Sequence, residues 1–357
     1  SRERGNIYDC VVPVSGGKDS FFQAYTAKKY GLNPLLVTFN HTFNTKVGIY
    51  NLQNMAKKID CDLLRFTPNE NAVRRISRHM LKTVGDVDWH SHAGIMTFPI
   101  QAAVMYNIPL VVWGEHGFAE LTGMFNMQDM VEFTKKCRQE HSMRGFEPED
   151  IIGYEGITRQ DIAPYIYPRE EDIERVGVTG IYISNYFFWD GKAQAELLID
   201  EYDFRTARQK DRTFNIYDKL DGLHQCGTHD FLKYLKFGYG RATDDASMEI
   251  RHGRMTREEG IEMVKKYDHV RPSDLDVYLN WVGMSEAEFM EAVEPMRDLR
   301  IWEKDASGTW QVKDSITHHV EDQGVDAVRL EVDKTDAGFK QNLPPYYWEQ
   351  DSGYMIL

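Results

Sequence analysis

The chain has 357 residues, a length that predicts one large domain with a smaller region attached. Its 42 lysines and arginines against 56 aspartates and glutamates give a formal net charge of -14, which argues against a broad nucleic-acid-binding surface, because such a surface needs a basic face. The sequence has four widely spaced cysteines and no secretory signal or long apolar run. These features predict reduced thiols, a cytoplasmic location and no contact with a membrane.

The first predicted element is a short buried strand that runs directly into a helix. The stretch from Cys10 to Val14 is almost wholly apolar, which is typical of a strand buried on both faces. From Asp19 onward the apolar residues take helical spacing, and Gly31 ends the pattern. The strand and the helix are therefore joined by a loop that ends at a helix N-terminus, where exposed N–H groups and the helix dipole favour an anion.

This loop has the composition of a phosphate-binding site. Gly16 and Gly17 let the backbone approach a phosphate closely, and Lys18 adds a positive charge. Ser15 and Ser20 add hydroxyl groups that can also bind the ligand. We therefore expect all five residues to bind the phosphate groups of a nucleotide.

The spacing differs from the Walker phosphate loop, which requires Gly-x-x-x-x-Gly-Lys-Ser/Thr. Residues 15–20, Ser-Gly-Gly-Lys-Asp-Ser, instead resemble the signature of the PP-loop ATP pyrophosphatases, which cleave ATP between the α and β phosphates. The resemblance implies ATP as the nucleotide and the loop as the site of the leaving pyrophosphate. Asp19 would suit a Mg²⁺ ion that bridges the pyrophosphate oxygens, because hard cations take carboxylate oxygens. A glycine-rich turn without a ligand is the alternative, although a turn alone needs neither the lysine nor the aspartate.

Strands and helices alternate through the next hundred residues. Strands are predicted at 35–39, 61–68 and 108–115, helices at 46–59, 70–83 and 96–106, and a further strand at 180–187. This alternation predicts an α/β fold with a doubly wound parallel sheet of the PP-loop type.

Ligands on such a sheet bind beyond the carboxyl ends of the strands. The ends of the second and fourth strands therefore join the loop along one rim. We expect Thr38, Phe39 and Asn40 to meet the adenine and the ribose. Gly114 and Glu115 are expected to meet the α-phosphate or the reacting group of the second substrate.

Beyond about residue 200 the pattern becomes helical. Capping-box sequences begin at Thr256 and at Ser285, each with a glutamate three residues later. We expect an ATP-binding domain over residues 1–200 and a mainly helical region over residues 201–357 that completes the substrate site.

The helical region contains a basic stretch, residues 236–260, in an otherwise acidic chain. Lys236 and Arg241 are candidate catalytic residues that would neutralise charge on the nucleotide or on an anionic sugar, since arginine forks match phosphate and carboxylate. An ion-paired surface explains the charge pattern equally well, because Asp244 and Glu249 are close in the sequence.

Histidine and cysteine give weaker signals. His90, His92 and His116 could hold a metal, but they fit polar residues at the rim of the nucleotide site better. Cys137 and Cys226 could share a zinc ion, yet neither belongs to a Cys-x-x-Cys pair, so isolated thiols are the better interpretation.

Several motifs together look like the N-acetyl sugar amidotransferase family. They are YDCVVPVSGGKDSFFQAY, LVVWGE, DGLHQCGTHDFLKYLKFGYGRATDDAS and IRHGRMTREEG. These enzymes are associated with bacterial surface polysaccharides, including lipopolysaccharide O-antigen, and convert an acetamido group on a sugar into an acetamidino group. The resemblance implies adenylation of the acetamido oxygen, attack by ammonia and release of AMP. The family often carries a cysteine-rich segment before the first strand, which this sequence does not contain, so a structural zinc is doubtful here.

The source of ammonia is expected outside the chain. A glutaminase would need a Gly-x-Cys-x-Gly elbow or an N-terminal cysteine, and Cys226 lies in the different context HQCGT. The expected partners are a separate glutaminase and a subunit like the cyclase of imidazole glycerol phosphate synthase, with no nucleic acid. Two alternatives remain: a PP-loop enzyme that modifies tRNA, of the thiolase or lysidine-synthetase type, and a nucleotide-binding regulator without catalysis.

Overall fold

The computed structural model describes residues 5–115, 133, 135, 137–209, 211–322 and 354–356. Its centre is a five-stranded sheet in the order β4-β2-β1-β5-β6, in which every neighbouring pair is parallel. The strands are β1 (Cys10–Pro13), β2 (Pro34–Phe39), β4 (Leu63–Phe66), β5 (Leu110–Trp113) and β6 (Thr179–Tyr182). The chain winds from β1 outward to β4 and then continues on the other side of β1. This confirms the predicted doubly wound sheet and puts the 15–20 loop where the strand order reverses, which is where such sheets bind ligands.

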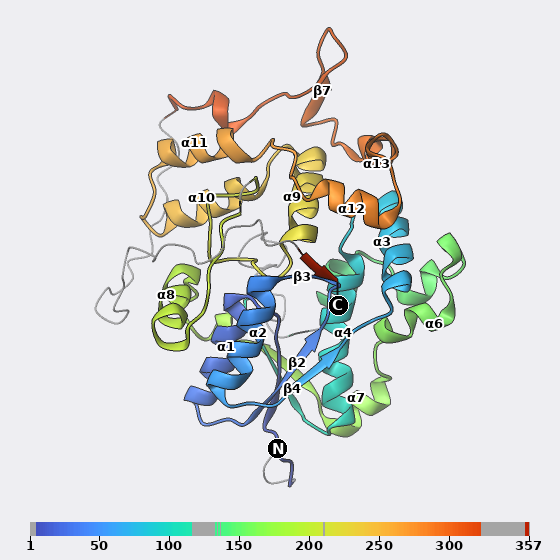
Figure 1. Cartoon of the computed structure of the whole chain (residues 1–357), viewed down its shortest axis with the longest axis vertical. Helices are drawn as coiled ribbons and strands as arrows, with labels where there is room; N and C mark the ends of the chain where they lie inside the picture. Colours follow the sequence, from blue (N-terminus) through green and yellow to red (C-terminus); the bar gives the residue numbers. More distant parts are fainter. Residues whose placement is uncertain are drawn as a thin grey trace.

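Helices cover both faces of this sheet (Figure 1). One face is covered by α1 (Lys18–Lys29), α2 (Lys46–Ile59) and α8 (Gly191–Tyr202). The other face is covered by α3 (Glu70–Val84), α4 (Trp89–Met105) and α7 (Glu170–Val176). Alternate strand residues supply the two cores, because side chains along a strand point to opposite faces. Val12 and Leu36 pack on the α1 side, whereas Val11 and Val37 pack on the α4 side.

Most predicted elements are confirmed to within a few residues, and two boundaries are wrong. The helix predicted at 96–106 begins at Trp89 and contains Pro99 in its interior. The polar residues before Met96 hid this start, but they are helical and mostly buried. The strand predicted at 180–187 ends at Tyr182, where the chain turns into the short 3-10 helix Ile183–Asn185.

The described part of the C-terminal region is mainly helical, as predicted. Its helices are α9 (Leu223–Phe237), α10 (Arg241–Arg251), α11 (Arg257–Tyr267), α12 (Leu275–Val282) and α13 (Glu286–Val293). Thr256 and Ser285 form the predicted capping boxes. An apolar core joins α9, α12 and α13 to α3, so the helical region packs against the sheet domain. The domain boundary near residue 200 stays a prediction.

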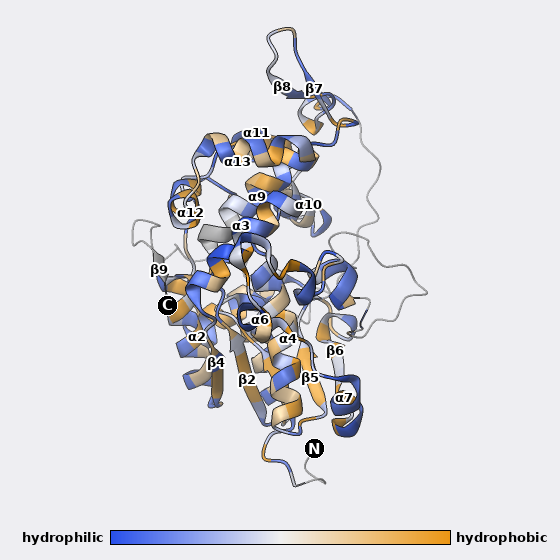
Figure 2. Ribbon diagram, turned by 90° about the vertical axis from the view of Figure 1, so that its right-hand side faces the viewer, coloured by the Kyte–Doolittle hydropathy of each residue, from blue (hydrophilic) through white to orange (hydrophobic). Residues whose placement is uncertain are grey.

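Shorter elements complete the described chain. β3 (Phe43–Thr45) pairs antiparallel with β9 (Tyr354–Ile356), and β7 (Trp302–Lys304) with β8 (Trp310–Val312). The other helical turns are Cys137–Ser142, Pro148–Ile151, Tyr154–Gly156, α6 (Arg159–Ile162), Ala163–Tyr165, Glu294–Met296 and Ile316–His318. Figure 2 shows mainly hydrophobic colour on the strands of the main sheet, in keeping with their burial. Among the described residues, no helix has the length and apolarity needed to cross a bilayer.

Candidate functional site

The loop after β1 is held in shape by its own serines. The Ser20 hydroxyl donates to the Gly17 carbonyl at 3.1 Å and accepts from the Ser15 N–H at 3.1 Å. The Gly17 N–H donates to the Ser15 hydroxyl at 3.3 Å. The N-cap of α1 is Gly17, which has no side chain to cap the first turn. The N–H groups of that turn are therefore suited to bind a ligand.

Two glycines let distant segments meet at this loop. A Cβ atom on Gly16 would lie 2.2 Å from the carbonyl oxygen of Gly48, in the first turn of α2. A Cβ atom on Gly48 would lie 2.5 Å from the Cα atom of Asp221, which comes from the C-terminal region. A larger side chain at either position would push these segments apart. Close backbone approach therefore requires glycine at both positions.

The N-termini of three helices converge on the loop. α1 starts at Lys18, and the first turn of α2 touches Gly16. Gly191, the first residue of α8, lies against Lys18, because a Cβ atom there would be 2.8 Å from the lysine ammonium. Each helix N-terminus carries roughly half a positive charge. Thr45 caps the N-terminus of α2 and the Asp190 carboxylate caps that of α8, whereas α1 has no side-chain cap. The N-terminus of α1 and Lys18 are therefore the part of this site suited to an anion such as a phosphate.

Lys18 is 3% exposed and is surrounded by carboxylates. Its ammonium donates to Asp19 at 2.5 Å and lies 3.6 Å from Asp218. Burial alone would lower the pKa of Lys18, but the charges of Asp19, Asp218 and Glu115 hold this pKa well above its usual range. Burial would likewise raise the pKa of Asp218, but nearby cations, with Lys18 the strongest, lower it to about 2. Lys18 is therefore charged, and two predicted site residues, Asp19 and Glu115, act on it directly.

Residues 211–222 bring acidic side chains to the loop from the C-terminal region. Thr45, the N-cap of α2, donates its N–H to the carbonyl of Asp221 at 3.1 Å. The Asp221 carboxylate then lies 3.4 Å from where a Cβ atom of Gly17 would stand. The sequence analysis missed both Asp218 and Asp221. Asp221 begins the motif DGLHQCGTHD, but nothing in the motif indicates that it returns to the loop.

A small cavity opens to the surface beside the loop. It connects the loop to the end of β2 and to the first turns of α2. Its lining residues are Ser15, Gly16, Thr38, Phe39, Asn40, His41, Asn44, Gly48, Ile49, Leu52, Arg65 and Asp221. The structure therefore brings the residues predicted for adenine and ribose to the same cavity as the loop.

Two predicted site residues, Phe39 and Gly114, cannot offer a side chain to a ligand. The ring of Phe39 lies in the core, 3% exposed, and stacks on Phe66 with 5.7 Å between the ring centroids. Gly114 has no side chain, and a Cβ atom there would lie 2.9 Å from the side chain of Gln23 in α1. Phe39 can therefore face the cavity only with its backbone, and Gly114 needs to be a glycine because α1 packs closely against it.

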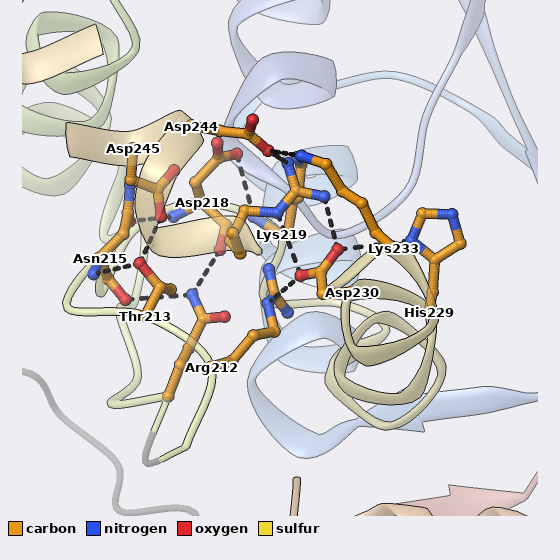
Figure 3. Close-up of polar contacts among 12 residues, drawn as sticks. Arg212, Thr213, Asn215, Asp218, Lys219, His229, Asp230, Lys233, Asp244 and Asp245 are labelled. Carbon is orange, nitrogen blue, oxygen red and sulfur yellow. Dashed lines mark hydrogen bonds and ion pairs between the residues drawn. The ribbon is translucent and has the colours of Figure 1, made fainter. Parts of the chain in front are cut away.

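Arg241 lies in a buried network of ion pairs, part of which is drawn in Figure 3. Its guanidinium contacts Asp230 at 2.7 Å and Asp244 at 3.1 Å, and Arg212 also contacts Asp230 at 2.7 Å. Burial would raise the pKa of Asp230, but the two arginines hold it well below its usual range. Figure 3 draws Asp218 beside this network, and both arginines help to lower its pKa. The charge of Arg241 therefore reaches the loop through Asp218.

Lys236 lies in a different place. Its ammonium donates to the carbonyl of Gly85 at 3.0 Å, in the connection between α3 and α4. Burial lowers the pKa of Lys236, and the charge of Asp86 opposes this effect. The structure thus separates Lys236 from Arg241, although the sequence analysis assigned both residues to the same ligand charge.

The histidines and cysteines form no metal site in the part of the chain that the structure describes. No group of three or more His, Cys, Asp or Glu side chains there could hold a metal ion. Burial lowers the pKa of His90 to about 3 and that of His92 to about 4, so both rings are neutral. Cys137 shares a hydrogen bond with a buried tyrosine hydroxyl at 3.3 Å. His116 and the side chain of Cys226 lie outside the described residues.

Residues 211–316 match a protein-family model described as "LPS biosynthesis protein WbpG-like, C-terminal domain". LPS, or lipopolysaccharide, is a bacterial surface polysaccharide. The match confirms the resemblance seen in the C-terminal motifs. It includes the segment that brings Asp218 and Asp221 to the loop.

Further similarities cover other parts of known proteins. The uncharacterized protein MJ1599 of Methanocaldococcus jannaschii is 31% identical over 96 residues, and the match spans 23% of this chain and 35% of that protein. NMN synthetase from Francisella tularensis has a TM-score of 0.27 and 15% identity, over 49% of this chain and 86% of that one. A predicted subunit of tRNA methyltransferase from Methanocaldococcus jannaschii has a TM-score of 0.26 and 19% identity, over 54% of this chain and 88% of that one. At these scores the fold assignment rests on the strand order of the sheet itself.

Proposed function

We propose that the protein is an ATP-dependent amidotransferase that converts an acetamido group of a sugar into an acetamidino group, in the cytoplasmic synthesis of a bacterial surface polysaccharide. The observation that carries the ATP part is the N-terminus of α1, which has no side-chain cap and lies in the 15–20 loop together with the buried Lys18. The family match of residues 211–316 supports the polysaccharide part. The sugar substrate is expected to be anionic or nucleotide-linked.

The proposed reaction solves a problem of amide chemistry. An amide carbon is a poor electrophile, and ammonia cannot displace its oxygen unless that oxygen becomes a leaving group. The acetamido oxygen therefore attacks the α-phosphorus of ATP, the bond between the α-phosphorus and the bridging oxygen breaks, and pyrophosphate leaves. Ammonia then adds to the carbon of the O-adenylyl imidate. The carbon–oxygen bond breaks, AMP departs, and the amidine remains.

The protein contributes positioning and charge stabilisation, because nucleotidyl transfer requires little covalent chemistry from side chains. Lys18 and the N–H groups of the first turn of α1 would hold the leaving pyrophosphate. Thr38 and Asn40 would bind the ribose and the adenine in the cavity beside β2. The charge of Glu115 helps to raise the pKa of Lys18, and this proximity supports a role for Glu115 beside the α-phosphate or the reacting amide.

Mg²⁺ is the ion expected with the nucleotide, and the residues around the loop fit it. Asp19 would supply one hard carboxylate oxygen of the kind this ion prefers, and the phosphate oxygens of the nucleotide would supply further ligands, because no group of three acidic or histidine side chains among the described residues could hold a metal by itself. When bound, Mg²⁺ neutralises charge on the phosphate groups of the nucleotide.

Ammonia is proposed to come from a separate glutaminase, with a cyclase-like subunit as a second partner. The sequence HQCGT around Cys226 does not have the form of a glutaminase elbow. Ammonium salts should therefore replace the glutaminase in an assay of this chain alone.

The test is to incubate the protein with candidate N-acetylated sugars, ATP, Mg²⁺ and ammonium, and to analyse the products by mass spectrometry. Conversion of acetamido to acetamidino exchanges an oxygen atom for an NH group. The mass of the sugar therefore falls by the difference between the mass of O and the mass of NH. AMP and pyrophosphate should appear in amounts equal to the amidine. ADP and orthophosphate as stoichiometric products would contradict the adenylation step, and AMP formation without any sugar amidine would contradict the amidotransferase assignment.

Replacing Gly48 by alanine is expected to weaken ATP binding at least about tenfold, because the new methyl group would collide with the backbone of Asp221. At an ordinary helix position the same change stabilises the helix by about 1 kcal/mol, so a loss must come from this collision. Calorimetric titration with ATP measures the effect. Gln53→Ala, at an exposed position of α2, is the control and should bind ATP like the wild type. Wild-type affinity in Gly48→Ala would show that the close contact is dispensable.

A further inference from the structure

Arg65 lines the cavity beside the loop and takes no part in the contacts described above. It lies on β4, and its register partner on β2 is Thr38, one of the residues predicted to meet the nucleoside. Side chains of paired residues in neighbouring strands lie on the same face of the sheet. Arg65 and Thr38 therefore stand next to one another at the carboxyl end of the sheet, on the side of the cavity.

The guanidinium of Arg65 carries a charge without an acidic partner in the part of the chain that the structure describes. Partial burial is the one cause that lowers its pKa, with no carboxylate to oppose it. Arg241 and Arg254, in contrast, each contact two carboxylates. The charge of Arg65 also acts inside the cavity. Burial lowers the pKa of His41, another lining residue, and the charge of Arg65 lowers this pKa further. A ligand in the cavity would therefore meet an available cation.

The strand order places Arg65 at the far end of the cavity from the phosphate loop. The loop follows β1, β2 is the next strand, and β4 is the strand beyond it. Neighbouring strands are about 4.8 Å apart, so β4 lies about 10 Å from β1. The ribose and the α-phosphate of a nucleotide together separate the base from the pyrophosphate group by a comparable distance. The base of a nucleotide held by the loop would consequently reach Arg65.

The other walls of the cavity suit a flat heterocyclic base. Ile49 and Leu52 provide apolar surface, and the buried amides of Asn40 and Asn44 are bonded to each other at 2.6 Å, which fixes the polar wall of the cavity. A guanidinium stacks favourably on the face of an aromatic ring. We propose that Arg65 stacks on the base of the bound nucleotide and makes the site prefer a purine to a pyrimidine, because the larger ring system offers more area to the guanidinium. This inference rests on the proposed use of ATP.

The test compares ATP, CTP and inorganic pyrophosphate as ligands of the wild type, Arg65→Ala and Arg65→Lys, by calorimetric titration. Arg65→Ala is expected to bind ATP about tenfold more weakly, to bind pyrophosphate unchanged, and to lose most of its preference for ATP over CTP. Arg65→Lys keeps the charge but not the planar group, so it should recover only part of the ATP affinity. Arg159→Ala removes an exposed arginine of α6 and is the matched control, which should bind all three ligands like the wild type.

The outcomes separate this inference from the proposed function. An equal loss of affinity for ATP and for pyrophosphate would mean that Arg65 binds phosphate, and would overturn the inference. Unchanged ATP affinity in Arg65→Ala would also overturn it, while the proposed use of ATP would stand. Failure of the wild type to bind ATP would overturn both. Arg65 is exposed on an edge strand, so the variants should fold, and thermal unfolding checks this.

Discussion

Lys18→Met and Asp19→Asn are each expected to lower amidine formation at least about a hundredfold, with ammonium as the nitrogen source. Lys18 stands between the N-termini of α1 and α8, and Asp19 holds its ammonium at 2.5 Å. Loss of one preorganised electrostatic contact at a reacting centre raises the barrier by about 2.7–4 kcal/mol. The measurement is the rate of AMP and amidine formation at saturating ATP and sugar.

Stability has to be measured beside the rate, because Lys18 is also the ion-pair partner of Asp218. Lys18→Met leaves that carboxylate without its strongest cation, so the protein should unfold at a lower temperature. Asp19→Asn keeps the size of the side chain and should unfold close to the wild-type temperature. Lys29→Ala, at the exposed end of α1, is the control and should change neither property. Near-normal turnover in both loop variants would refute the catalytic role of the loop.

The loop and the rim of the sheet could be predicted because their geometry is local. A buried strand, two glycines and a helix follow one another directly, so residues 15–20 must lie at a helix N-terminus. Parallel strands also align their carboxyl ends, which explains why Thr38 and Asn40 line the same cavity as Ser15. Neither conclusion depends on how the rest of the chain folds.

The contacts that complete the site could not be predicted, because they depend on segments that return from far along the chain. Gly48 and Gly191 are ordinary helix residues in the sequence, and their need for glycine arises only from what packs on them. Asp218 lies in a stretch without regular structure and reaches Lys18 across the interface with the C-terminal region. A strand pattern likewise places Phe39 at the rim but does not reveal that its ring is buried in the core.

The pattern of charges in the sequence also did not predict where Lys236 and Arg241 lie in the structure. They are close in the sequence, but Lys236 lies in the last turn of α9 and Arg241 begins α10. Gly238 lies between them with φ of 75°, a left-handed conformation that ends α9 and turns the chain. The two cations therefore face different neighbours, which a count of basic residues does not show.

Arg241→Ala is expected to lower the free energy of unfolding by about 3–5 kcal/mol, because it removes one of the two arginines that compensate the buried Asp230. Asp244 also loses its contact with the guanidinium. Equilibrium unfolding in urea measures the change. A surface ion pair would instead contribute at most about 1 kcal/mol.

Arg251→Ala is the matched control, because Arg251 is exposed on the same helix and its guanidinium donates to the hydroxyl of Ser247 at 3.3 Å. It should change the free energy of unfolding by less than about 1 kcal/mol. Turnover per folded molecule then separates the two roles of Arg241. A structural role predicts that activity falls with the folded fraction, whereas a catalytic role predicts a further loss of at least about tenfold, or 1.4 kcal/mol in the barrier. Because the Arg241 guanidinium is engaged by two carboxylates, one of them fully buried, we expect the structural outcome, and a large loss of turnover at unchanged stability would contradict it.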